Sequence, residues 1–208
     1  MELIQRARVV SMQEHLAGIM AHRESAYRAS LPRTVVDARL KRFEPRNAAD
    51  AAVLARTRDW LTGLMAGKAD NLSLVGPPGT GKTWLMSAIG WALLPTEHAA
   101  TYLRAPSAWA AVKATYDGQG ESERALMSRW ITAKVLLLDE IGAGNVTEPY
   151  RACIAEIICR RTDEGLPTVA ASNLALADWP KALDDRAADR MAGGTTIALL
   201  GASRRGAA

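Results

Sequence analysis

The first 46 residues carry a helical pattern that ends at two proline-containing pairs. Between residues 2 and 23, apolar side chains recur at three- and four-residue steps with polar residues between them, a spacing that predicts an amphipathic helix. Its apolar positions are Val9, Met12, Leu16, Ile19 and Met20. Leu31-Pro32 ends this helix and Glu44-Pro45 ends the basic stretch after it, because a residue before proline avoids helical backbone. We predict a helical partner-binding region over 1–46 and a second unit over 47–208.

From residue 47 onward, helical patterns alternate with short apolar runs. Asn47 is a favourable N-cap for a first helix, and Gly67 is a favourable end for it. The predicted strands are then 72–75, 101–104, 134–138, 168–171 and 196–200. The predicted helices lie at 84–94, 148–163 and 184–191, and more than one helix is predicted across 106–131. Strands that alternate with helices indicate a parallel sheet covered by helices, so the expected fold class is α/β.

The composition fits a globular protein and argues against several other classes. Of the 208 residues, 49% are apolar and 23% are charged, enough for one domain core and a smaller appendage. No stretch reaches the length of a membrane span, and the first residues lack the apolar core of a signal peptide. Cys153 and Cys159 point to different faces of a helical run, and the three histidines are scattered. We expect a cytoplasmic protein with no membrane contact, no disulfide and no cysteine or histidine metal cluster.

The net charge of +4 is unevenly distributed along the chain. Residues 1–47 carry nine Lys/Arg and five Asp/Glu, whereas residues 48–208 carry 17 of each. This asymmetry indicates an appendage that meets an acidic partner, either nucleic acid or protein; a solvated helix surface explains it equally well.

Eight consecutive residues match every fixed position of the G-x-x-x-x-G-K-[ST] phosphate-binding loop, the Walker A motif, between a predicted strand and a predicted helix. They are Gly76, Pro77, Pro78, Gly79, Thr80, Gly81, Lys82 and Thr83. In such a loop backbone N–H groups surround the phosphates, the lysine reaches the β- and γ-phosphates, and the hydroxyl ligates Mg²⁺. The helix start adds the positive end of its dipole. The chain is therefore predicted to bind a nucleoside triphosphate with Mg²⁺.

The second half of a nucleotide site is predicted at the end of the 134–138 strand. This apolar run is followed by Asp139 and Glu140, the Walker B arrangement, which places one carboxylate beside Mg²⁺ and a second where it can polarise water. An acid above a water molecule is needed for hydrolysis and not for phosphoryl transfer to a metabolite. The pair therefore favours an ATPase.

Asn173 follows the 168–171 strand and has two interpretations. Its amide can hold the attacking water or the γ-phosphate, or it can serve as a helix cap or turn former. The residue types alone do not separate these two roles.

Taken together, these motifs resemble the AAA+ ATPases of the DnaC, DnaI and IstB group over about residues 47–205. The resemblance rests on GPPGTGKT, on LLLDEIG, on Ala171-Ser172-Asn173-Leu174, on the stretch 183–191 and on Gly201-Ala202-Ser203-Arg204-Arg205. It implies a P-loop fold and makes Asn173 the sensor of the γ-phosphate. Only 37 residues follow Ala171, so we expect no full helical lid. Glu140 replaces the second aspartate of many members, which is a mild change.

The same resemblance implies roles for three arginines. Arg186 and Arg190 match a family pair in which Arg190 would be the arginine finger for a neighbouring subunit's nucleotide and Arg186 its support. Arg205 matches the second sensor on the bound nucleotide, although Arg204 stands where the family usually has an aromatic residue, which leaves Arg204 or Arg205 as the sensor. A pair of helix arginines is otherwise most often solvated or paired with neighbouring acids such as Asp185 and Asp189.

A finger supplied by a neighbour implies an oligomer, such as an arc or a helical array with ATP at each interface. In the replication branch of the family, the helical region between the second and third strands lines single-stranded DNA. The corresponding candidates here are Lys113, Tyr116, Arg124 and Arg129, each of which solvated surface explains equally well.

Two family functions and two others follow from these patterns. The leading prediction is an ATP-dependent loader, compact or phage-encoded, that grips a hexameric replicative helicase through residues 1–46 and assembles on single-stranded DNA. The alternative within the family is an IstB-like helper of DNA transposition, acting on duplex DNA. A metabolite kinase conflicts with Asp139-Glu140 and the terminal arginines, and a nucleotide-gated adaptor with little hydrolysis conflicts with an intact Glu140.

Overall fold

A five-stranded parallel sheet forms the centre of the protein. The computed structural model describes residues 2–68, 70–118 and 120–204, with side chains from residue 13 onward. The strands are β1 (Leu72–Val75), β2 (Ala100–Arg104), β3 (Val135–Ile141), β4 (Thr168–Ser172) and β5 (Thr195–Ala198). Their order across the sheet is β2-β3-β4-β1-β5, and every pairing is parallel. The predicted α/β class and all five predicted strands are confirmed.

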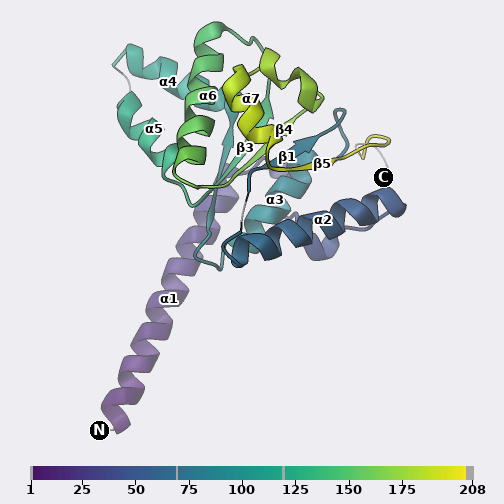
Figure 1. Cartoon of the computed structure of the whole chain (residues 1–208). Coiled ribbons are helices and arrows are strands. Elements are labelled where there is room, and N and C mark those ends of the chain that lie inside the picture. Colours follow the sequence, from purple (N-terminus) through teal and green to yellow (C-terminus); the bar gives the residue numbers. More distant parts are fainter. Residues whose placement is uncertain (1, 69, 119, 205–208) are drawn as a thin grey trace.

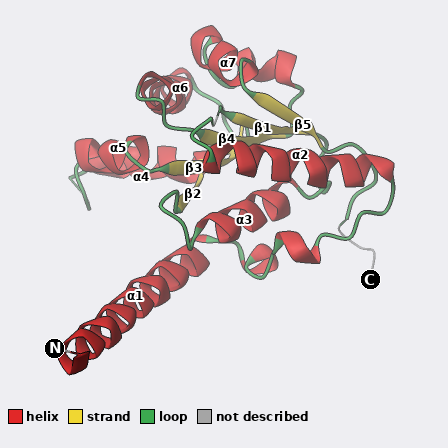
Figure 2. Ribbon diagram, turned by 60° about the horizontal axis from the view of Figure 1, so that its bottom comes forward, coloured by secondary structure: helices red, strands yellow, loops and turns green. Residues whose placement is uncertain are grey.

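Helices cover both faces of the sheet. They are α1 (Glu2–Ser30), α2 (Ala48–Met65), α3 (Lys82–Leu93), α4 (Ala105–Tyr116), α5 (Glu123–Ile131), α6 (Glu148–Asp163) and α7 (Asp185–Ala192). Figure 1 shows α4 to α7 on one face and α2 and α3 on the other. Figure 2 shows α1 extending away from this body. Across the described residues, no helix combines the length and the hydropathy needed to cross a bilayer.

Local signals in the sequence fix the helix ends. Helix α1 ends at Ser30, two residues before Pro32. The Asn47 side chain accepts a hydrogen bond from the Asp50 N–H at 2.9 Å and caps α2. Beyond that helix, Gly67 has a φ of +71°, a left-handed conformation that suits glycine. The predicted caps and breaks are thus confirmed.

Two apolar clusters, one on each face of the sheet, form the core. Leu74, Leu85 and Ile89 belong to the cluster under α2 and α3, and Leu138 and Ile154 belong to the cluster under α4 to α7. Alternate residues of a strand point to opposite faces. Because both faces are covered, the three inner strands β1, β3 and β4 are buried along almost their whole length, and their sequences are mostly apolar.

The end of α1 and the segment after it are packed against α3. The Tyr27 hydroxyl donates a hydrogen bond to the Ser87 carbonyl at 3.0 Å, and its ring meets Trp91 edge-on at 5.2 Å between centroids. The Trp91 indole N–H donates to the Val36 carbonyl at 2.9 Å, and Arg39 lies over the Trp91 ring. Packing therefore continues across the division predicted at residue 46, which stays a prediction about function.

Arg161 is a buried cation that sequence patterns gave no reason to single out. Its guanidinium donates to the carbonyls of Trp130, Ile131 and Ala133 at 2.7–2.9 Å, and also to Pro167 and Thr168 on the way into β4. Burial lowers its pKa to about 10. One side chain thus joins the end of α5 to the starts of β3 and β4 by donating to carbonyl groups at the ends of these elements.

We expect Arg161→Ala to lower the free energy of unfolding by at least about 3 kcal/mol, since it leaves several buried carbonyls without donors and opens a cavity. Urea unfolding followed by circular dichroism measures the change. The control is Arg160→Ala. The Arg160 side chain is 59% exposed, so this substitution should change the free energy of unfolding by less than about 0.5 kcal/mol. Equal effects of the two substitutions would contradict this account of Arg161.

We expect Gly90→Ala to destabilise the attachment of α1, because a Cβ at residue 90 would lie 1.9 Å from the Tyr27 hydroxyl and 2.7 Å from a Leu137 methyl group. Overpacking of this kind costs about 1–3 kcal/mol. Gly63→Ala in α2 is the matched control: the nearest atom is 3.6 Å away, so helix propensity should stabilise the protein by about 0.4–1 kcal/mol. Thermal unfolding of both variants compares these effects.

Candidate active site

The phosphate-binding loop joins β1 to α3 and keeps the shape that its glycines permit. Gly76 and Gly81 have φ values of +148° and +101°, and Gly81 is the residue before the first turn of α3. A Cβ on Gly76 would lie 2.2 Å from the Leu199 carbonyl oxygen. Glycine is therefore required at residue 76 for its backbone angle and for the close approach of the chain after β5.

Lys82 begins α3 and turns its ammonium group back into the loop. The Nζ donates to the carbonyls of Gly76 and Pro77 at 2.6 and 2.8 Å, and the residue is buried. These contacts hold the cation among backbone oxygens at the mouth of the loop. Phosphate oxygens are stronger acceptors for the same group, so the lysine lies where the predicted contact with β- and γ-phosphates requires it.

Asp139 lies at the carboxyl end of β3, and it is only 2% exposed. The Thr83 hydroxyl, the Tyr102 hydroxyl at 2.9 Å and the Glu140 N–H at 2.9 Å donate hydrogen bonds to its carboxylate. Burial raises the pKa of Asp139, and these three donors oppose the shift. A buried carboxylate beside a threonine hydroxyl is a set of hard oxygen donors, which fits Mg²⁺ bound by the protein together with phosphate oxygens. Thr83 and Asp139 would hold the ion.

Glu140 has a backbone conformation that is unusual for its residue type. Its φ is +61°, the one positive value for a non-glycine residue in the described part of the chain, and the β3–β4 register shifts between Leu138 and Ile141. A bulge of this kind changes the direction of one side chain. Strain of about 1–3 kcal/mol at such a residue is typical of functional positions.

Arg104 holds the Glu140 side chain and is a site residue that the sequence patterns did not indicate. It ends β2, beside Asp139 in the register, and its guanidinium contacts Glu140 Oε2 with Nε at 3.0 Å and Nη2 at 2.5 Å. The carboxylate raises the pKa of Arg104 through this hydrogen bond. An arginine at the carboxyl end of the neighbouring strand was the available signal, since parallel strand ends meet at one edge of the sheet.

Asn173 lies at the same edge as the two motifs. It follows Ser172, which pairs with Val75 of β1 and with Ile141 of β3. Its side chain is exposed, so it can reach a ligand held between the phosphate-binding loop and Glu140. The topology thus brings Asn173 to the place that a γ-phosphate sensor needs, while its role stays a prediction.

The chain after β5 crosses the outside of the phosphate-binding loop. The Arg204 N–H donates to the Gly79 carbonyl at 2.8 Å, and its guanidinium pairs with Asp50 at 2.6 Å. The same group lies over the Phe43 ring at 4.8 Å. Although burial by itself raises the pKa of Asp50, hydrogen bonds from Arg46 and Arg204 lower it overall. Arg204 therefore contacts the phosphate-binding loop, and Arg205 lies outside the described residues.

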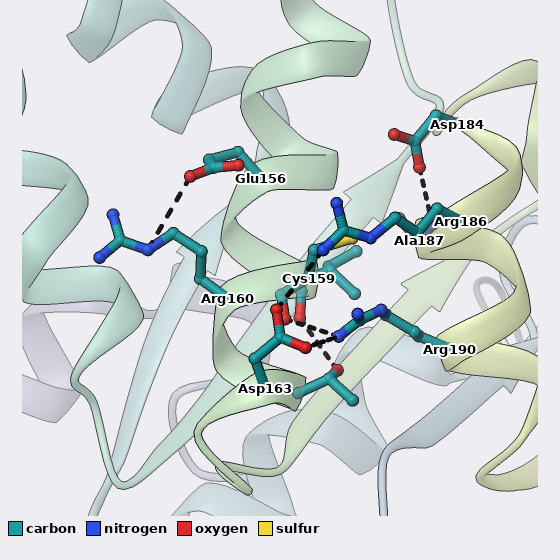
Figure 3. Close-up of polar contacts among 10 residues, drawn as sticks. Glu156, Cys159, Arg160, Asp163, Asp184, Arg186, Ala187 and Arg190 are labelled. Atoms are coloured by element: carbon teal, nitrogen blue, oxygen red, sulfur yellow. Dashed lines mark hydrogen bonds and ion pairs between the residues drawn. The ribbon is translucent and has the colours of Figure 1, made fainter.

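The two arginines of α7 lie apart from these groups. Both Arg186 and Arg190 contact Asp163 at the end of α6, as Figure 3 shows. Helices α6 and α7 cover one face of the sheet, whereas α3, which begins at Lys82, covers the other (Figure 1). The structure thus brings Lys82, Thr83, Asp139, Glu140 and Asn173 to one edge, and it places Arg186 and Arg190 elsewhere.

The four candidate DNA contacts lie on or beside α4 and α5. All four side chains are exposed. Lys113 is 5.9 Å above the Trp109 ring, and Arg129 pairs with Glu121 at 2.8 Å. Tyr116 ends α4 and Arg124 lies in the first turn of α5. Their positions allow contact with a nucleic acid, and this role stays a prediction.

Comparison with known proteins identifies a family and several relatives of this chain. A family model described as IstB-like ATP binding protein matches residues 7–192. The replicative helicase loader DnaC of Escherichia coli (strain K12) is 30% identical over 125 residues, which are 60% of this chain and 51% of that protein. The replicative helicase loader DnaI of Bacillus subtilis (strain 168) is 32% identical over 108 residues, which are 51% of this chain and 34% of that protein. The chain therefore spans about half of the first relative and a third of the second.

A crystal structure of the DnaC helicase loader has the same fold. It aligns with a TM-score of 0.71 at 20% sequence identity, over 80% of this chain and 99% of the solved chain. The predicted P-loop fold of the AAA+ type is confirmed by this likeness, together with the strand order and the loop geometry described above.

We expect Glu140→Gln to retain ATP binding and to lower the rate of hydrolysis about 10²- to 10⁴-fold, because an amide cannot take a proton from water. A fluorescent ATP analogue measures the affinity, and phosphate release measures the rate. Glu164→Gln, an exposed position after α6, is the control and should leave both values unchanged. Full hydrolysis by the Glu140 variant would remove this residue from the mechanism.

Proposed function

Because the chain belongs to the family of IstB-like ATP binding proteins, we propose that it is an ATP-dependent replicative helicase loader. The main evidence for ATP hydrolysis is that the phosphate-binding loop, Asp139 and Glu140 all lie at the carboxyl ends of the strands. In this proposal, ATP is hydrolysed at interfaces between subunits that assemble on single-stranded DNA. The helicase-loader relatives support the cellular role.

The residues of the edge divide the chemistry among them. The loop N–H groups and Lys82 bind and orient the phosphates, and Thr83 and Asp139 would hold Mg²⁺. When bound, this ion neutralises charge on the β- and γ-phosphates. Glu140 accepts a proton from the attacking water, and Asn173 orients the water or the γ-phosphate. Arg204, on the outside of the loop, holds the Phe43 and Asp50 region against it.

The Arg104–Glu140 pair supports slow turnover by a free subunit. A carboxylate oxygen that is bound by a guanidinium is not available to accept a hydrogen bond from an attacking water. Both side chains are partly exposed, and exposed ion pairs contribute only about 0.2–1 kcal/mol. A small rearrangement at the end of β2 on assembly or on DNA binding would therefore release Glu140 for hydrolysis.

The position of α1 supports a role in holding the helicase. The helix extends from the body (Figure 2), and its root is fixed by Tyr27. Two of its apolar side chains, Leu16 and Ile19, are 53% and 38% exposed. An apolar pair on a projecting helix is suited to packing against a partner protein.

Transposition support is the second candidate function. The family match, which is named for IstB-like proteins, favours it as much as it favours loading. In that case α1 would contact a transposase, and the ATPase unit would assemble on duplex DNA. The identity of the protein partner and the strandedness of the DNA separate the two functions.

The experiment is light scattering of the full chain mixed with its cognate hexameric helicase and ATP. We expect a defined complex with the unchanged chain. Leu16→Asp combined with Ile19→Asp should weaken it at least about tenfold, a loss of 1.4 kcal/mol, with the ATPase rate preserved. Met65→Asp, at another exposed apolar position, is the control. Absence of a helicase complex, with binding of duplex DNA and a transposase, would instead establish the transposition role.

A further inference from the structure

The chain from the last turn of α1 to the start of α2 concentrates the positive charge of the protein. Residues 28–46 contain six Lys/Arg and two Asp/Glu, a net charge of +4 that equals the net charge of all 208 residues. Two short 3₁₀ helices, Arg33–Val35 and Leu40–Arg42, lie in this segment and pack against α3. The segment is therefore on the face of the sheet opposite to α4 and α5 (Figure 1). We define the basic patch as the side chains of Arg28, Arg33, Arg39, Lys41 and Arg42.

Three arginines of the basic patch are gathered around one tryptophan. The Arg39 guanidinium lies 3.6 Å over the centroid of the Trp91 ring, and that of Arg28 is 5.4 Å from the same centroid. Arg28 pairs with the Asp37 carboxylate at 3.2 Å, and Arg42 donates to the Asp37 carbonyl at 3.3 Å. Contacts to one ring and one aspartate therefore hold three guanidinium groups in a small region.

The cations of the basic patch repel one another. Burial lowers the pKa of Arg39, and the charges of Arg28 and Arg42 lower it further. Asp37 and Glu24 oppose this shift without cancelling it. Like charges that lie close together raise the free energy of the patch, and a bound anion would remove that repulsion. The arrangement therefore favours a negatively charged ligand.

Packing within the subunit explains Arg39 but not the whole basic patch. Arg39 covers the Trp91 ring and donates to two backbone carbonyls of its own segment. Arg33, Lys41 and Arg42 are exposed instead. Folding of the subunit therefore gives no reason for three cations on the outer side of two short helices.

The surface of this segment presents charge and little apolar area. Leu31, Ala38 and Phe43 are buried, and Leu40 packs against the same core. The large apolar side chains that are exposed in the described residues belong to other parts of the chain. Contacts between proteins depend mainly on aromatic and apolar anchors, whereas a nucleic-acid backbone is bound mainly through cations. The composition of the patch is of the second kind.

The α4–α5 surface is less suited to a polyanion. Residues 113–129 contain three Lys/Arg and three Asp/Glu, so their charges cancel. Arg129, one of the candidate DNA contacts, is already paired with Glu121 at 2.8 Å. Electrostatic attraction of a nucleic acid is therefore stronger at the basic patch than at α4 and α5.

We propose that the basic patch binds the phosphate backbone of DNA without regard to base sequence. Guanidinium groups offer paired donors that match phosphate oxygens. Because Trp91 and Asp37 already position Arg28 and Arg42, little side-chain entropy is lost when a phosphate binds. The inference rests on the proposed function, since it names the surface through which subunits meet DNA. It divides the predicted partner-binding region 1–46 into a helical part for protein and a basic part for DNA.

The test measures binding of a fluorescent oligothymidine strand to the full chain, by anisotropy with ATP present, over a series of salt concentrations. The combined variant Arg33→Gln, Lys41→Gln and Arg42→Gln removes three exposed cations and keeps those over Trp91. The slope of the logarithm of affinity against the logarithm of salt should fall in magnitude by about 2, since each phosphate contact with a single strand contributes about 0.7. Affinity at low salt should fall at least about tenfold, with the melting temperature unchanged.

A control variant with the same change in net charge separates the basic patch from the overall charge of the protein. Arg58→Gln, Arg160→Gln and Lys181→Gln remove three exposed cations outside the patch, and this variant should keep the salt slope of the unchanged chain. A strand of mixed sequence should give the same differences as oligothymidine, because phosphate contacts do not read bases. A salt slope and affinity that the patch variant shares with the unchanged chain would overturn the proposal.

The corresponding variant of the α4–α5 surface carries Lys113→Gln, Arg124→Gln and Arg129→Gln. Its salt slope should change less than that of the patch variant. Loss of slope in this variant alone would place the DNA contact on α4 and α5 and would contradict the proposal.

Further outcomes distinguish the inference from the proposed function. A patch variant that keeps its DNA affinity but loses the helicase complex in light scattering would show that the patch binds an acidic protein, and the inference would be wrong. Binding of duplex DNA only, with the expected loss in the patch variant, would support the patch and favour the transposition role. An unchanged chain that binds neither single-stranded nor duplex DNA would contradict assembly on DNA, and with it both proposals.

Discussion

The hydrogen bond between the Thr83 hydroxyl and the Asp139 carboxylate connects the two halves of the nucleotide site. Asp139 is buried at the end of the central strand β3, where a carboxylate is stable only with donors around it. Thr83 is in the first turn of α3, so this contact sets the start of α3 against the end of β3. Both ends of the loop between β1 and α3 are then held in place, which restricts the conformation of the loop. The geometry of Lys82, of the loop and of Glu140 follows from this one buried carboxylate.

The phosphate-binding residues and the arginines of α7, which an AAA+ ATPase site combines, lie in different parts of this subunit. The phosphate-binding loop and the acids lie at the edge where α3 begins, and the arginines of α7 lie over the opposite face (Figure 1). Within one subunit, α7 packs against α6 on the sheet face opposite to α3. This separation is the physical basis for proposing that turnover depends on a second copy. Asp163 pairs with both α7 arginines and balances one of their two positive charges.

Sequence patterns predicted the strands, the helix ends and the loop because each of these depends on neighbours in the chain. Pro32, Asn47 and Gly67 act within a few residues, and the loop motif is contiguous. Arg104 and Arg161 were missed because their contacts depend on the register of β2 with β3 and on the meeting of α5 with β4. The contact of Tyr27 was missed for the same reason, because Tyr27 packs against Gly90, which lies 63 residues further along the chain. No periodicity in the sequence encodes such contacts.

The arginine at residue 204, where the family usually has an aromatic residue, has a physical explanation. Its planar guanidinium lies 4.8 Å over the Phe43 ring and bonds to Asp50 at 2.6 Å. A guanidinium can stack on an aromatic face as a ring does, and it adds directed hydrogen bonds that a ring lacks. Asp50 is in turn held by Arg46. The departure from the family pattern therefore brings a stacking contact and an ion pair, which tie the chain after β5 to the start of α2. Since Arg204 also bonds to Gly79, this tie reaches the phosphate-binding loop itself.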